Sequence, residues 1–69
     1  MDASDLRIFE AVARLGGMNR AAAALNTVQS NVTARIRALE EQLGVQLFRR
    51  TSRGVSLTAA GERLLPELV

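Results

Sequence analysis

The sequence predicts a mainly α-helical domain in which three helices form the core and a short β-hairpin and a last helix follow. Apolar residues recur at spacings of three and four up to residue 43, which is typical of amphipathic helices. Glycine or asparagine stands where each of these patterns stops. Two short β-type runs then surround a polar turn. With 69 residues and no Cys, the chain can bury only a small core, so we expect helix packing or self-association to stabilise it.

The first helix is expected from about residue 4 to residue 15. Ser4 or Ala3 would begin it, and Gly16 with Gly17 would end it through a positive φ. The apolar residues that would face the core are Leu6, Phe9, Val12 and Ala13, with Ile8 and Leu15 at the edges.

A short second helix is predicted from the run RAAAAL, residues 20–25, in which four alanines combine high helix propensity with little bulk. Asn19 would cap its N-terminus. Asn26 would adopt a left-handed conformation, and Thr27 would then cap a third helix. Two helices joined by so tight a turn form a helix-turn-helix.

The third helix carries an apolar stripe at spacings of four, four, three and four: Val28, Val32, Ile36, Leu39 and Leu43. The opposite pole carries Ser30, Thr33, Ala34, Arg37 and Glu41, and the stripe is flanked by Gln29 and Arg35. Residues 19–39 contain no Asp or Glu, whereas Glu40 and Glu41 stand near the helix end, which Gly44 closes. The outward N-terminal half of this helix is therefore small, polar or cationic.

The β-type runs cover residues 45–49 and 55–57, and Gly54 in the turn between them is typical of a hairpin. Three arginines belong to this hairpin loop: Arg49, Arg50 and Arg53. Thr58 would cap the last helix, which Pro66 would bend because proline removes a helical hydrogen bond. The last helix carries three leucines that either fold back on the monomer or, as the favoured alternative, form a dimer interface: Leu64, Leu65 and Leu68.

Composition argues against catalysis and against metal binding. The chain has no His and no Cys, so it lacks the usual general base, the readiest nucleophile and the ligands of an ordinary zinc site. We therefore expect no enzyme activity, no metal and no cofactor. The N-terminus resembles neither a signal peptide nor a membrane span, so a cytoplasmic protein is expected.

Positive charge is concentrated in two places. All nine basic residues are Arg, against seven Asp and Glu, which gives a net charge of +2. Residues 19–39 carry three arginines and no acid, and residues 49–53 carry three more. Basic islands of this kind are typical of nucleic-acid-binding modules.

The third helix suits the major groove of duplex DNA, which admits one helix between two rows of phosphates. Amides and hydroxyls on its outward half can bond to base edges, Ala34 can contact a thymine methyl group, and arginine can bind guanine or phosphate. In the hairpin loop, Arg53 beside Gly54 is the best candidate for a narrow minor groove. Arg49 and Arg50 suit phosphates or an ordinary solvated surface.

Two other functions are compatible with these residues. A protein-interaction module would use the same helical surface to bind an acidic partner, as an antitoxin or adaptor does. An RNA-binding module is disfavoured because the chain has no Tyr or Trp and both Phe residues lie in apolar patterns, which leaves no aromatic platform for bases. Binding that weakens steeply with salt distinguishes a nucleic acid from an apolar protein partner.

The stretch from Arg20 to Gly61 closely resembles the N-terminal winged helix-turn-helix of LysR-type transcriptional regulators. The resemblance is carried by the alanine pair of the second helix, Gln29, Val32, the run I-R-A-L-E-E-x-L-G-V-x-L-F-x-R at 36–50, R-G-V at 53–55 and L-T-x-A-G at 57–61. The chain departs from the family pattern at four places: Gly17 and Val28 where the family usually has Ser, Ser30 where it often has Pro, and Ala34 where it often has Arg. From Ala34 we expect a different base preference, from Val28 a cap shifted to Thr27, and from Gly17 a weaker phosphate contact at the second helix.

The resemblance implies a bacterial regulator that binds an interrupted dyad in double-stranded promoter DNA as a homodimer or tetramer. It implies a winged helix-turn-helix DNA-binding domain over residues 1–57, with a recognition helix at about 28–42, and the start of a linker and dimerisation helix over 58–69. The effector-binding domain of such regulators is expected to be absent. The family's DNA contacts fall on Gln29, Ser30, Thr33, Ala34 and Arg53. With the charge pattern added, the candidate DNA-binding residues are Asn19, Arg20, Gln29, Ser30, Asn31, Thr33, Ala34, Arg35, Arg37, Arg49, Arg50 and Arg53.

Overall fold

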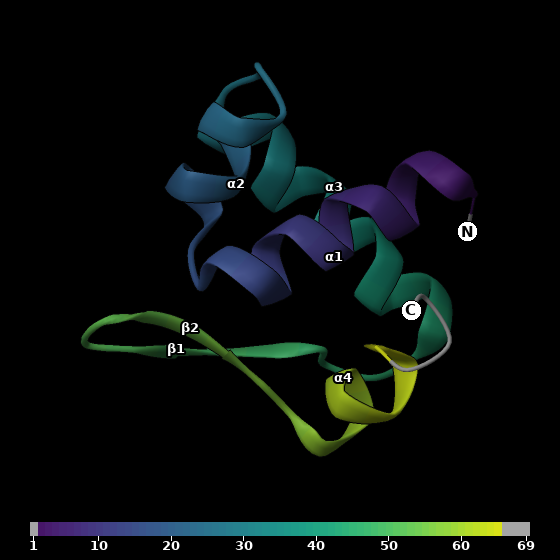
Figure 1. Ribbon diagram of the computed structural model, residues 1–69. Coiled ribbons are helices and arrows are strands. Elements are labelled where there is room, and N and C mark those ends of the chain that lie inside the picture. The colour runs from purple at the N-terminus through teal and green to yellow at the C-terminus, as the bar shows by residue number, and fades with distance from the viewer. Residues whose placement is uncertain (1, 66–69) are drawn as a thin grey trace.

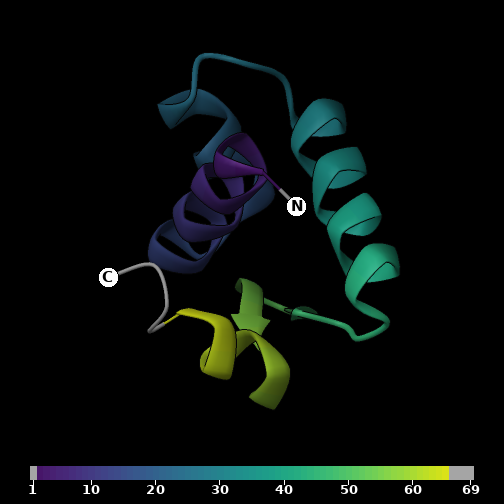
Figure 2. The same ribbon diagram turned by 90° about the vertical axis from the view of Figure 1, so that its right-hand side faces the viewer.

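The computed structural model describes residues 2–65 and has the predicted mainly α-helical architecture. Its elements are α1 (Ala3–Leu15), α2 (Met18–Ala24), α3 (Gln29–Leu43), β1 (Phe48–Thr51), β2 (Gly54–Leu57) and α4 (Ala59–Leu64). Figure 1 shows the first three helices packed together, with the hairpin and α4 below them. The view turned by 90° shows the same two layers, with α3 running along one side of the helical layer (Figure 2).

Helix α1 begins with a capping box. The Asp2 side chain accepts a hydrogen bond from the Asp5 N–H at 2.9 Å, and the Asp5 carboxylate accepts one from the Asp2 N–H at 3.3 Å. Asp2 is therefore the N-cap, and the helix begins at Ala3, one of the two predicted first residues. Gly16 ends the helix at φ 74°, as predicted.

Helix α2 begins at Met18, one residue before its predicted cap. Gly17 takes the N-cap position with extended backbone, so Asn19 lies inside the first turn and its predicted capping role was wrong. Ala21 and Ala22 are buried. Their small side chains let α2 pack closely against both α1 and α3.

The turn after α2 contains the predicted left-handed residue, Asn26, at φ 58°. Val28 takes the N-cap position of α3 and makes no side-chain capping bond. The predicted cap, Thr27, was therefore wrong: its N–H completes the end of α2 by donating to the Ala22 carbonyl at 2.9 Å, and its hydroxyl accepts from the Asn31 amide at 3.1 Å.

The core joins the three helices to the entry of the hairpin. From α3 it takes Val32, Ile36 and Leu39, whereas Val28 is 63% exposed and Leu43 39% exposed, so the predicted apolar stripe is core only in its middle. Leu47 and Phe48 are also buried. The rings of Phe48 and Phe9 lie 5.3 Å apart at 46°, a tilted aromatic pair that ties the hairpin to α1.

The hairpin is a two-stranded antiparallel sheet in which Phe48 pairs with Leu57 and Thr51 with Gly54. Its first strand begins three residues later than predicted because Leu47 enters the core before pairing starts. Arg49 and Arg50 consequently lie in β1, and of the three loop arginines only Arg53 lies in the turn.

Close backbone approaches hold the hairpin beneath the helices. The Val55 N–H donates to the Gly16 carbonyl at 3.1 Å. Gly54 has φ 134°, and a Cβ there would overlap the same carbonyl oxygen, so glycine is required on both conformational and steric grounds.

Helix α4 is capped by Thr58, as predicted, whose hydroxyl accepts from the Gly61 N–H at 3.1 Å. Leu64 and Leu65 are half-buried and pack against the core of their own chain. The third predicted interface leucine, Leu68, and the predicted bend at Pro66 lie outside the described residues. Among residues 2–65, no helix is long and apolar enough to cross a membrane.

Candidate nucleic-acid interface

Helix α3 presents three surfaces besides its buried side. Gln29, Thr33 and Arg37 follow one another at intervals of four and line hollows between α3 and the hairpin. Ser30 and Ala34 are exposed and point outward next to this row. The remaining surface of α3 is directed toward the first turn of α1 and carries Asn31 and Arg35.

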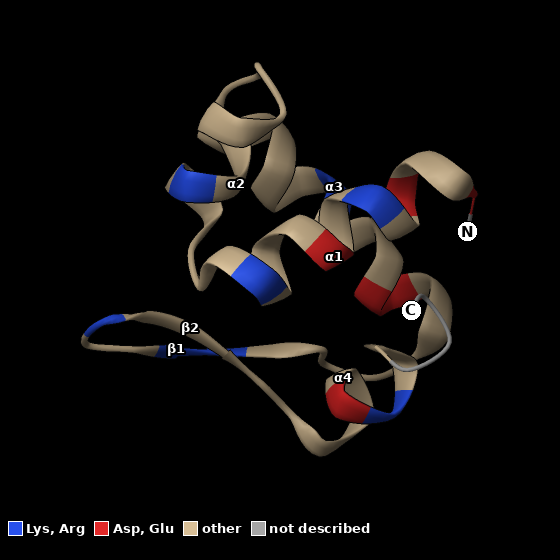
Figure 3. Cartoon of the chain, viewed as in Figure 1, with Lys and Arg blue, Asp and Glu red and all other residues tan. Residues whose placement is uncertain are grey.

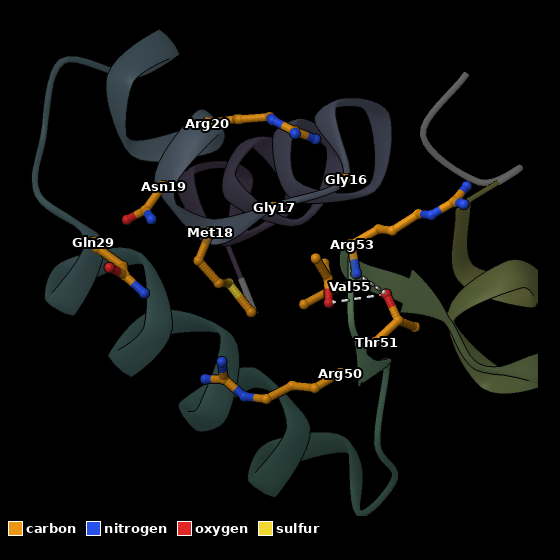
Figure 4. Close-up of a pocket in the computed structure, with 11 residues that line it drawn as sticks. Gly16, Gly17, Met18, Asn19, Arg20, Gln29, Arg50, Thr51, Arg53 and Val55 are labelled. Atoms are coloured by element: carbon orange, nitrogen blue, oxygen red, sulfur yellow. Dashed lines mark hydrogen bonds between the residues drawn. The ribbon is translucent and has the colours of Figure 1, made fainter.

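The first hollow, of about 290 Å³, lies where the start of α3, the start of α2 and the hairpin tip meet. Asn19 and Arg20 contribute from α2, Gln29 from α3, and Arg50 and Arg53 from the hairpin (Figure 4). The hollow thus brings together five predicted DNA-binding residues from three separate segments.

A second hollow, of about 350 Å³, continues along α3 toward its C-terminus. Thr33 and Arg37 line it from the helix, and Arg49 and Arg50 line it from β1. Arg50 belongs to both hollows, so they form one continuous face between α3 and the hairpin. We call the row Gln29, Thr33 and Arg37, together with the hairpin arginines, the hairpin-side face.

The side chains of two hairpin arginines, Arg50 and Arg53, point in different directions. Arg50 is paired with Val55 across the sheet, and residues in such a pair share one side of it. In Figure 4 the Arg50 side chain extends toward α3, whereas the Arg53 side chain extends away from α3. The turn that carries Arg53 is closed by Thr51, whose hydroxyl accepts from the Arg53 N–H at 3.2 Å and donates to the Gly54 carbonyl at 3.3 Å.

The charges of the hairpin-side face are not neutralised within the described part of the chain. There, Arg37, Arg49, Arg50 and Arg53 form no ion pair, and Arg20 donates to the Leu15 carbonyl at 3.2 Å. Figure 3 shows basic residues along the hairpin and acidic residues on α1, α4 and the C-terminal part of α3. The hairpin-side face is therefore open to an anionic ligand.

Arg35 is held differently, by the first turn of α1. Its guanidinium donates to Asp5 at 2.7 and 3.1 Å and to the Ser4 hydroxyl at 3.1 Å, and it lies 4.0 Å from Asp2. The Arg35 hydrogen bond keeps the pKa of the Asp5 carboxyl below its ordinary value, with a further contribution from the Asp2 backbone N–H. Arg35, one of the predicted DNA-binding residues, is thus an ion-pair partner within the fold.

Sequence reasoning missed this ion pair because its partners are 30 residues apart and no local pattern links them. It also missed the roles of Asp2 and Thr51. The Asp2 cap had a local signal, since another acceptor side chain follows three residues later, as in a capping box. The Thr51 hydrogen bonds depend on the geometry of the turn, which could not be predicted because the first strand was placed at the wrong residues.

The hairpin-side face combines amide and hydroxyl groups on a helix with guanidinium groups on a neighbouring strand and turn. Such groups can donate to base edges and to phosphate oxygens. An α-helix fits the major groove of a duplex, which is about 12 Å wide, and the minor groove, about 6 Å wide, admits only a thinner element.

Known proteins are similar to this chain in both sequence and fold. A family model described as "Bacterial regulatory helix-turn-helix protein, lysR family" matches residues 3–62. The HTH-type transcriptional regulator YofA of Bacillus subtilis (strain 168) is 62% identical over 65 residues, which are 94% of this chain and 23% of YofA. The HTH-type transcriptional regulator CzcR of Bacillus anthracis is 52% identical over 65 residues, with the same coverage. The chain thus spans about a quarter of the length of these curated relatives.

Two solved structures superpose closely. The structure of the CbnR_DBD–DNA complex matches with a TM-score of 0.93 and 43% identity, over 97% of this chain and 77% of that one. The structure of the BenM_DBD/benA site 1 DNA complex matches with a TM-score of 0.92 and 36% identity, over 97% of this chain and 75% of that one. These similarities extend over α1–α3 and the hairpin alike.

Proposed function

The chain belongs to the lysR family of bacterial regulatory helix-turn-helix proteins, and we propose that it is the part of a transcriptional regulator that binds specific sequences in double-stranded DNA. The observation that supports this most is the hairpin-side face, where polar side chains of α3 and the arginines of the hairpin line connected hollows. Their guanidinium groups form no ion pair within residues 2–65. Binding, and not catalysis, is the role of such a regulatory domain.

In the proposed complex, the N-terminal half of α3 lies in the major groove and the hairpin follows the DNA backbone. Gln29 and Thr33 donate to base edges, and Ala34 contacts thymine methyl groups. Arg53, at the hairpin tip, enters the adjacent minor groove. The other arginines of the hairpin-side face, Arg37, Arg49 and Arg50, bind phosphates, as does Arg20 of α2. Asn19 and Ser30 add polar groups beside these contacts, and Asn31 adds one on the side of α3 that faces α1.

The relatives support a regulatory role and a DNA partner. YofA and CzcR are named as transcriptional regulators, and the superposed CbnR and BenM structures are DNA complexes. We place the protein in the bacterial cytoplasm, where promoter DNA is found. We also propose that it acts as a homodimer, or as a tetramer in a longer chain, on an operator with dyad symmetry.

Salt dependence tests the DNA interpretation. If four or five phosphates are neutralised per monomer, log affinity should fall against log salt with a slope of about −4. Fluorescence anisotropy with a labelled duplex at several salt concentrations measures this slope. A slope near zero would favour an apolar protein partner instead. Arg63→Ala on α4, away from the hairpin tip, is the matched control and should leave the slope unchanged.

Sequence specificity requires a separate experiment. Selection of bound duplexes from a random DNA pool should yield a defined half-site. On that duplex, Gln29→Ala or Thr33→Ala should reduce discrimination by about 1–3 kcal/mol if these residues read bases. Gln42→Ala, an exposed amide in the last turn of α3, should change nothing. Discrimination that survives both Gln29 and Thr33 substitutions contradicts their assignment.

The dimer is tested by sedimentation. Leu64 and Leu65 are half-buried in the monomer, which leaves part of each side chain for a partner. The chain should sediment as a dimer when concentrated, and Leu65→Asp should shift it to monomer mass because a carboxylate opposes apolar burial. Monomer mass before and after the change contradicts dimerisation through α4.

A further inference from the structure

Glu40 links α3 to the start of the hairpin. Its side chain is half-buried, and one carboxylate oxygen, Oε2, accepts from the Leu47 N–H at 2.8 Å and from the Phe48 N–H at 3.3 Å. Leu47 and Phe48 are 1% and 8% exposed. Buried backbone N–H groups need a partner, and hydrogen bonds to an ionised acceptor are the stronger kind.

Both strands of the hairpin contact α1, and β1 is also bonded to α3. β2 packs against α1 and α4, and Val55 donates to the Gly16 carbonyl. β1 contacts α1 through the Phe48–Phe9 ring pair and is linked to α3 by the Glu40 carboxylate, immediately before its two arginines. Among these links, the Glu40 bonds are the ones that join β1 to α3, so they set the position of Arg49 and Arg50 relative to that helix.

Glu40 also lies in the wall of the second hollow, together with Thr33, Arg37, Arg49 and Arg50. It stands between the part of α3 proposed for the major groove and the strand proposed to follow the backbone. A carboxylate near DNA repels phosphate, so its presence there needs a compensating role. Its bonds to the hairpin backbone supply one.

We propose that Glu40 is a positioning residue that fixes the separation and angle between α3 and the hairpin, and so places Arg50 and Arg53 for the duplex. This inference rests on the DNA binding proposed above. Glu40 touches no DNA; it acts through the hairpin backbone. Its neighbour Glu41 is exposed and accepts no side-chain hydrogen bond within the described residues.

The test compares Glu40→Ala with Glu41→Ala on the duplex obtained by selection. Both changes remove one negative charge, which by itself strengthens DNA binding. Glu41→Ala should therefore bind as well as the original chain or better. Glu40→Ala should bind about tenfold more weakly, the loss equivalent to one hydrogen bond to a charged group. Equal behaviour of the two variants would overturn the proposal.

A double-mutant cycle separates positioning from general destabilisation. In a chain that already carries Arg50→Ala and Arg53→Ala, Glu40→Ala should cause no further loss, because the arginines that it places are gone. In a Gln29→Ala background it should cause its full loss. A full loss in both backgrounds would mean that Glu40 supports the whole fold and not the hairpin in particular. If Glu40→Ala does not fold, Glu40→Gln replaces it; because its neutral oxygen is a weaker acceptor, a smaller loss of affinity is expected, which should again disappear in the Arg50→Ala, Arg53→Ala background and persist in the Gln29→Ala background.

The positioning role is also measured without DNA. Residual dipolar couplings of the hairpin amides report its orientation relative to α3, and hydrogen exchange at Leu47 and Phe48 reports their bonds. Both should change in Glu40→Ala and stay the same in Glu41→Ala. If the hairpin of Glu40→Ala is unchanged, the positioning role is contradicted, even when the original chain binds DNA. If the hairpin of Glu40→Ala is reoriented but the original chain binds no specific duplex, only the proposed function is contradicted.

Discussion

Arginines stand on both sides of α3, but the fold treats them differently. On one side Arg35 is bound by Asp5 and approached by Asp2. On the other, Arg37 lines a hollow with Arg49 and Arg50, and within residues 2–65 none of these three has a carboxylate within ion-pair distance. An arginine is therefore a DNA-contact candidate only when no other element supplies its counter-ion.

The asymmetry follows from how the neighbouring segments begin. Helix α1 starts with a capping box of two aspartates, which places carboxylates beside the middle of α3. Helix α2 starts at a glycine without a side-chain cap, and the hairpin between Phe48 and Leu57 contains no acid. The capping aspartates of α1 thus neutralise one side of α3, whereas on the other side Glu40, which lines the second hollow, is bonded to the hairpin backbone.

The largest effect on DNA affinity is expected from Gly54→Ala, which displaces the hairpin. Gly54→Ala places a Cβ against the Gly16 carbonyl oxygen and forces alanine to φ 134°. The hairpin has to move away from the turn between α1 and α2. We expect specific DNA affinity, measured by anisotropy, to fall about a hundredfold, equivalent to losing two contacts of about 1.4 kcal/mol each.

Gly44→Ala provides the matched control. Gly44 also has a positive φ, 71°, but a Cβ there meets nothing within 4 Å. This change should lower stability by only about 1 kcal/mol, the left-handed penalty of a non-glycine residue, and should leave DNA affinity nearly unchanged. Equal losses of affinity in the two variants would mean that backbone strain, and not the hairpin position, determines binding.

The second-largest effect is expected from Arg50→Ala, and its comparison with Arg35→Ala separates an arginine that forms no ion pair within residues 2–65 from one that is held in an ion pair. Arg50→Ala should weaken DNA binding about tenfold and make the salt slope about 0.9 shallower, since one phosphate contact is lost. Arg35→Ala should leave the slope unchanged and instead lower the midpoint of thermal unfolding, because the Asp5 carboxylate loses its partner. Calorimetry and salt titration of the two variants measure both quantities. A shallower slope in Arg35→Ala would place Arg35 on the DNA.

Features of the fold that depend on neighbouring residues could be predicted from the sequence, whereas those that depend on distant partners could not. The helix-turn-helix, the left-handed Asn26, the stop at Gly44 and the cap at Thr58 depend on neighbouring residues and were predicted. The predicted start of the first strand was wrong because Leu47 packs into the core, and this tertiary packing overrides the local β propensity. Arg35 and Glu40 could not be interpreted alone, since their partners lie 30 and seven or eight residues away across a fold that had first to be known.

The smallest effect is expected from releasing Arg35 by Asp5→Asn. Without this carboxylate, Arg35 can turn toward a phosphate, so affinity for non-specific duplex should rise about twofold to threefold, with a salt slope steeper by up to about 0.9. Glu10→Gln changes the net charge equally but releases only the exposed Arg14. An equal rise in both variants would assign the effect to overall charge.

Asp5→Asn should also change how stability depends on pH. The hydrogen bond from Arg35 lowers the pKa of Asp5 in the folded chain, so the ionised carboxylate stabilises the fold above its unfolded pKa of about 3.9. This contribution is lost as the pH falls from that value through the folded pKa. The midpoint of thermal unfolding, followed by circular dichroism, should therefore decline less steeply below about pH 4 in Asp5→Asn than in the original chain. Parallel declines would mean that the Asp5 ion pair contributes nothing to stability, and Arg35 would then count as available on its side of α3 like the arginines opposite.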